Sequence, residues 1–110
     1  MGLIQLVSNE TYIIQNQYEL NFKVERFLSI KGYAKVHWRV TYKSHTFPDT
    51  YGNVEFKVGE LEKSIKVQLN NSISEKPTRI ELFNPTKLYQ FGNNKMAQIS
   101  LVCKFFICIV

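Results

Sequence analysis

Two stretches of the chain alternate strictly between apolar and polar residues, and this period of two is the strongest constraint on the fold. Residues 18–25 read YELNFKVE and residues 35–42 read KVHWRVTY. Successive side chains of a β-strand point to opposite faces of the sheet, so each stretch is predicted to be a half-buried strand. Trp38 is expected in the core with Val36 and Val40. No window of eleven residues carries the i, i+3, i+4, i+7 apolar pattern of an amphipathic helix.

Turn residues divide the remainder of the chain into short segments of similar length. They cluster at five places, which are Gly32, Pro48 to Gly52, Val58-Gly59, Asn70 to Ser72 and Gly92 to Asn94. The spacing predicts about seven antiparallel strands in a two-sheet β-sandwich. The 110 residues, 45% of them hydrophobic, are enough for one core, so residues 1–110 are expected to form a single domain.

The order of signals in residues 51–85 identifies a family. A Gly52 strand, a Val58-Gly59-Glu60 turn, a lysine-bearing strand and a final strand ending in Asn84-Pro85 follow one another. This order resembles the Calx-β domain family, whose members have G-x-V-x-F-x-x-G-E and, later, L-x-N-P. Residues 22–26 and 36–41 lie where the family has its V-x-R and V-x-V-x-Y-x-T strands, so the resemblance spans about residues 12–102. It implies an immunoglobulin-like all-β sandwich.

The resemblance also implies a function: a non-enzymatic interaction, adhesion or spacer module within a larger protein. Its expected partners are another protein or a neighbouring domain. Most hosts of the family place the module outside the cell or at its surface, although the sodium–calcium exchangers are a cytosolic exception. Catalytic motifs are absent from the sequence, which has two histidines and no G-x-S-x-G, H-x-x-x-H or C-x-x-C spacing.

Calx-β domains often bind calcium at one end of the sandwich, and the resemblance assigns five positions of this chain to such a site. Two of them, Asp49 and Glu75, are carboxylates. The others are amides: Gln15, Asn70 and Asn71. Amide side chains supply oxygen without charge, and calcium affinity depends on the number of charged ligands. The site is therefore interpreted as degenerate, and no cofactor is expected.

The chain is basic, with 14 Lys and Arg against nine Asp and Glu and a formal net charge of +5. Five residues of one predicted strand share a face without an interleaved aromatic, and we call them the basic stripe: Lys35, His37, Arg39, Thr41 and Lys43. One interpretation is a solvated outer face. The alternative is a polyanion site for sulfated glycan or nucleic acid, with the chain acting as a stand-alone basic β-sandwich protein of microbial or viral origin.

The C-terminal segment is the most apolar part of the chain. Apart from Lys104, both faces of a strand are apolar from Val102 onward, so this end is either covered by the domain's own strands or packs against a partner. The partner interpretation predicts an interface at Phe105, Phe106 and Cys108. The stretch is too short to span a bilayer, which takes about 20 residues.

Overall fold

The computed structural model describes residues 2–14, 17–28, 32–44, 46–69 and 76–102, and the regular secondary structure in these ranges is β-strand. Within the described residues, no helix is long and apolar enough to cross a membrane. The described residues form nine strands in sequence order, namely β1 (Gly2–Leu6), β2 (Glu10–Ile14), β3 (Glu19–Phe27), β4 (Ala34–Tyr42), β5 (Thr50–Phe56), β6 (Glu62–Gln68), β7 (Pro77–Phe83), β8 (Tyr89–Phe91) and β9 (Met96–Val102). The all-β prediction is confirmed.

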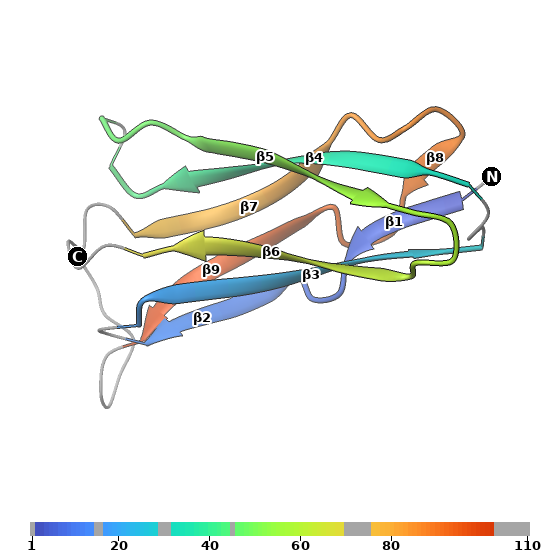
Figure 1. The fold of residues 1–110 in the computed structure, drawn as a ribbon. Helices are drawn as coiled ribbons and strands as arrows, with labels where there is room; N and C mark the ends of the chain where they lie inside the picture. The colour runs from blue at the N-terminus through green and yellow to red at the C-terminus, as the bar shows by residue number, and fades with distance from the viewer. Residues whose placement is uncertain (1, 15–16, 29–31, 45, 70–75, 103–110) are drawn as a thin grey trace.

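The strands form two sheets that pack face to face (Figure 1). One sheet has four strands in the order β6-β3-β1-β8, and the other has five in the order β2-β9-β7-β4-β5. Most neighbours are antiparallel, but β1 pairs with β8 and β2 pairs with β9 in parallel. The predicted two-sheet sandwich is therefore confirmed, and the described residues differ from it in having nine strands in place of about seven and one parallel pair in each otherwise antiparallel sheet.

The extra strands arise because the chain crosses between the sheets near each end. Residues 7–9 carry it from β1 in the four-stranded sheet to β2 in the five-stranded sheet, and residues 92–95 carry it from β8 to β9. The divided pieces run in the same direction, which produces one parallel pair in each sheet. The first crossing contains no Gly or Pro, and its Ser8-Asn9 pair was not counted among the turn signals of the sequence.

The core lies between the sheets and follows the predicted alternation. Leu20, Phe22 and Val24 of β3 point inward with Ile80 and Leu82 of β7, and all five are at most 5% exposed. The predicted strands over residues 18–25 and 35–42 correspond to β3 and β4. Alternation located these strands because burial of one face is a local, repeating property.

Trp38 differs from its prediction, because it is half-buried against the core and not part of its centre. Its cross-strand neighbour is Gly52 of β5, the outermost strand of the five-stranded sheet (Figure 1). A Cβ at Gly52 would lie 2.3 Å from Cζ2 of the indole ring. The missing side chain thus leaves the space into which the ring extends, at the edge of the sheet.

Candidate functional site

A buried arginine holds the turn between β5 and β6 in place. Arg26 continues the inward face of β3 after Val24 and is 1% exposed. Its Nε donates to the Glu60 carbonyl at 2.7 Å, and its Nη2 donates to the Lys57 carbonyl at 2.5 Å. Nη1 donates to the Gly32 carbonyl and to the Tyr89 hydroxyl, each at 3.1 Å. We call this set of contacts the Arg26 clip.

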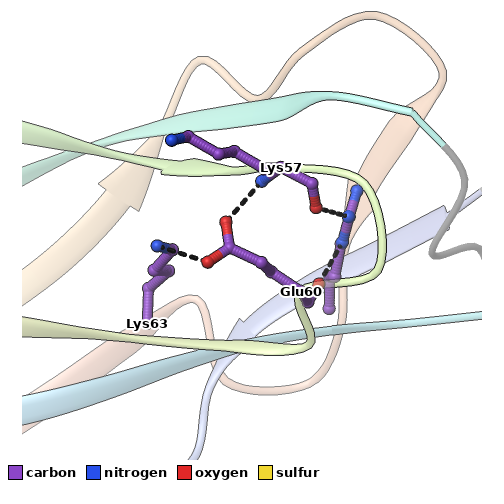
Figure 2. Close-up of polar contacts among 4 residues, drawn as sticks. Lys57, Glu60 and Lys63 are labelled. Atoms are coloured by element: carbon purple, nitrogen blue, oxygen red, sulfur yellow. Dashed lines mark hydrogen bonds and ion pairs between the residues drawn. The ribbon is translucent and has the colours of Figure 1, made fainter.

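Glu60 closes the same turn from the solvent side. Figure 2 shows its carboxylate between the main-chain N–H of Lys57, at 2.6 Å, and the ammonium of Lys63, at 2.7 Å. These two donors, Lys63 first, lower the pKa of the Glu60 carboxyl group. Gly59 takes the left-handed conformation, with φ of +84°, which favours glycine. The turn is thus fixed from within by a guanidinium and from outside by a carboxylate.

The basic stripe lies on the outer face of the five-stranded sheet, where neighbouring strands bring acidic side chains to it. Glu81 of β7 forms an ion pair with Arg39, and Glu55 of β5 lies 4.0 Å from the Lys35 ammonium. Lys43 lies directly after β4. Sequence reasoning missed both carboxylates, because cross-strand neighbours depend on register and strand order. Two of the cations assigned to a polyanion site therefore already have acidic partners.

Aromatic rings also reach this face, although they come from the neighbouring strands β5 and β7 and not from β4 itself. The Phe83 ring lies 5.6 Å from His37 and 6.2 Å from Tyr51, measured between ring centroids. Hydrogen bonds to Glu81 and then Tyr51 raise the pKa of Arg39 above its ordinary value. Arg39, Tyr51 and Phe83 border a shallow groove of about 290 Å³. The face is a mixed polar and aromatic surface and not a plain cationic stripe.

Of the five assigned calcium positions, only Asp49 falls in the described residues, where it is half-buried in the loop before β5. The remaining four lie outside them: Gln15, Asn70, Asn71 and Glu75. Lys76 is 5% exposed, and its Nζ has no hydrogen-bond partner among the described residues. Within that part of the chain, no three His, Cys, Asp or Glu side chains are grouped to hold a metal ion.

Lys76 and Asp49 belong to the same end of the sandwich. The Lys76 carbonyl accepts a hydrogen bond from the Lys43 main chain at the end of β4. The side chain of Tyr42, the residue before Lys43, extends toward β5. Its hydroxyl lies 2.7 Å from the hydroxyl of Thr50, the residue that follows Asp49. The buried Lys76 ammonium at this end opposes the binding of a calcium ion by Coulomb repulsion.

The predicted interface residues Phe105, Phe106 and Cys108 lie outside the described residues. β2, which pairs with β9, carries apolar side chains on its outer face. Ile14 of β2, paired with Val102 of β9, is 66% exposed, and Tyr12 is 54% exposed. The interface therefore stays a prediction.

No protein-family model and no curated protein sequence matches the chain. Solved structures do match it. The apo form of the Calx CBD1 domain matches with a TM-score of 0.79 and 17% sequence identity, over 94% of this chain and 97% of that one. The chain has the Calx-β sandwich fold. CBD12 from CALX1.2 matches with a TM-score of 0.77 and 20% identity over 91% of this chain, which spans 43% of that one. The Calx CBD2 domain matches with a TM-score of 0.70 and 16% identity, over 90% of this chain and 85% of that one.

The Arg26 clip joins the two sequence segments that carry much of the resemblance to the Calx-β domain family. Residues 22–26 contain the V-x-R pattern and residues 54–60 contain V-x-F-x-x-G-E. Arg26 of the first donates to carbonyls of the second across 31 and 34 residues of sequence. The available signal was an arginine in phase with the apolar face of a predicted strand. Its acceptors are groups of the protein itself, so the clip has a structural role.

Proposed function

We propose that the chain is a non-enzymatic Calx-β module that acts as an interaction or spacer unit of a larger extracellular or cell-surface protein, without a working calcium site. The fold shared with the Calx domains supports the module class. CBD12 of CALX1.1 and of CALX1.2 are longer chains, of which this chain spans 44% and 43%. That relation supports a role beside a neighbouring domain.

The charge at the assigned calcium positions is the observation that carries the calcium-independent part of the proposal. Three of the five positions are amides, which leaves two carboxylates to offset a divalent ion. The buried ammonium of Lys76 adds a positive charge at the same end. Both features lower the affinity for calcium relative to a site built from carboxylates alone.

A thermal unfolding experiment tests this proposal. A ligand that binds only the folded state stabilises it by RT ln(1 + [L]/Kd), about 2.7 kcal/mol at a hundredfold excess over Kd. We expect the same melting temperature in chelator and in about 1 mM calcium, a concentration that matches the dissociation constants of weak extracellular calcium-binding modules. Magnesium at the same concentration is the control for general ionic effects. A calcium-specific rise of several degrees that disappears in Asp49→Ala would refute the proposal.

A polyanion-binding role for the basic stripe is the second candidate. The net charge of +5 favours it, but the ion pairs of Lys35 and Arg39 with Glu55 and Glu81 reduce the positive charge on that face. We therefore rank it below the interaction module.

A further inference from the structure

Three runs of the sequence have the Asn-x-Ser/Thr pattern, in which the asparagine side chain is an acceptor for an N-linked glycan. They are residues 9–11, 70–72 and 84–86. The pattern requires a middle residue other than proline, and this requirement excludes residues 84–86, which read Asn-Pro-Thr. Residues 70–72 lie outside the described residues. Residues 9–11 are therefore the intact pattern that the structure describes.

Asn9 lies in the crossing that carries the chain from β1 to β2. Residues 7–10 are all exposed, so this crossing is at the surface. Main-chain bonds fix its course: the Leu6 N–H donates to the Asn94 carbonyl at 2.7 Å, and the Gln98 N–H donates to the Asn9 carbonyl at 3.0 Å. The backbone around Asn9 is thus held in place without the Asn9 side chain.

The two side-chain groups that define the pattern have no structural partner. Neither the Asn9 carboxamide nor the Thr11 hydroxyl makes a hydrogen bond among the described residues. The excluded run differs, because the Thr86 hydroxyl accepts from the Lys35 N–H at 2.7 Å and donates to the Lys35 carbonyl at 3.0 Å. The Thr86 hydroxyl therefore has a structural role, whereas the described contacts give the Thr11 hydroxyl none.

A polar hollow of about 430 Å³ lies beside Asn9. Asn9 borders it together with residues 92–96 and Gln98. Amide side chains make up much of this lining, and each amide both donates and accepts hydrogen bonds, as sugar hydroxyls require. A sugar attached to Asn9 therefore has space and hydrogen-bonding groups next to it.

We propose that Asn9 is an N-glycosylation site. The proposal rests on the extracellular or cell-surface location in the proposed function, because the modification is made on secreted chains. In the reaction, Nδ2 of Asn9 attacks the anomeric carbon of an oligosaccharide carried on a lipid diphosphate. The bond from that carbon to the diphosphate oxygen breaks, Nδ2 loses one proton, and the lipid diphosphate leaves. The Thr11 hydroxyl is the group by which the transferring enzyme selects the acceptor.

The position of this site leaves the ends of the sandwich free. The crossing from β1 to β2 lies about midway along the molecule, between the end where β1 begins and the end where β9 finishes (Figure 1). An N-linked glycan is bulky and solubilising, so it would cover the flank that carries it. The site is therefore compatible with a spacer role in which neighbouring domains join at the ends.

The test is secretion of the full chain from mammalian cells behind a cleavable signal, followed by intact mass before and after peptide N-glycosidase F. An Asn70→Gln background assigns any change to a single site. We expect most of the secreted chain to lose the mass of one glycan, with Asn9 converted to aspartate and Asn84 unmodified. Because Asn9 is exposed, the glycosidase should act on the folded protein without denaturant.

Substitutions at Thr11 provide the matched controls. Thr11→Val keeps the β-branched shape that suits β2 but removes the hydroxyl, so the glycan should be lost. Thr11→Ser keeps the hydroxyl and should keep the glycan. Asn9→Gln removes the acceptor without breaking a described hydrogen bond, so this variant should melt at the same temperature as the deglycosylated protein; it stays informative if Thr11→Val fails to fold.

Three results would overturn the proposal. The first is a folded, secreted chain without a glycan at Asn9, and the second is a glycan that persists in Thr11→Val. The third is a glycan that is released only after denaturation or that lowers the melting temperature, since the folded structure would then not accommodate it. None of these results depends on calcium, and a calcium-stabilised chain would refute the proposed function while leaving the glycosylation result intact.

Discussion

Replacement of Arg26 by methionine tests whether the Arg26 clip stabilises the sandwich. Methionine retains an unbranched apolar stem of similar reach but removes every N–H donor. The Lys57 carbonyl keeps its bond from the Glu60 N–H at 3.0 Å, so three other described acceptors lose the hydrogen bond that Arg26 donates to them. Those three are the Glu60 carbonyl, the Gly32 carbonyl and the Tyr89 hydroxyl.

The expected loss of stability follows from these contacts. Hydrogen bonds to charged groups contribute about 1.5–3 kcal/mol each, but burial of the guanidinium offsets part of this contribution. With about 1 kcal/mol remaining per lost bond, Arg26→Met should lower the free energy of unfolding by about 3 kcal/mol. Unfolding entropies near 2.1 cal/mol/K per residue convert this to a fall in melting temperature of roughly 13 °C.

Urea and thermal unfolding measure the effect, with Lys23→Met as the matched control. Lys23 lies on the same strand, its side chain is 60% exposed, and its ion pair with Glu62 should contribute at most about 1 kcal/mol. Amide hydrogen exchange provides a second readout, because residues 57–61 should exchange faster in Arg26→Met. Unfolding midpoints of the two variants that agree within error would refute the structural role of the clip.

Three further outcomes are expected. Because the pKa of Glu60 is lowered in the folded state, its contribution to the free energy of unfolding is present above the ordinary carboxyl pKa near 4.5 and is lost as the pH falls through the lowered value. Glu60→Gln should therefore flatten the acid side of a plot of stability against pH. An unchanged slope would contradict this. Gly52→Ala should displace the Trp38 ring and red-shift its fluorescence with a loss of stability, whereas an unaltered spectrum would show that the ring does not occupy that space. If the basic stripe binds polyanions, replacement of Lys35, Arg39 and Lys43 by serine should abolish retention on a heparin column. Equal retention of the variant would assign binding to the net charge of the chain.

Properties that repeat within one strand could be predicted from the sequence alone. The alternation in residues 18–25 and 35–42 located β3 and β4 and their buried faces, and the Val58-Gly59-Glu60 signal located the turn between β5 and β6. The order of those signals led to the Calx-β fold that the solved Calx domains share. These inferences succeeded because strand pleating and positive-φ turns depend on neighbouring residues.

Pairing across the sheets was decided only by the tertiary structure. The basic stripe was correctly placed on one face, but its acidic neighbours Glu55 and Glu81 come from strands whose order and register no local pattern encodes. The division of the terminal strands between two sheets could not be seen in the sequence for the same reason. Arg26 is in phase with the apolar face of its strand, but the carbonyls of Lys57 and Glu60 that accept from it lie more than 30 residues away in the sequence. Local periodicity determined which faces are apolar, and long-range packing determined which polar groups meet.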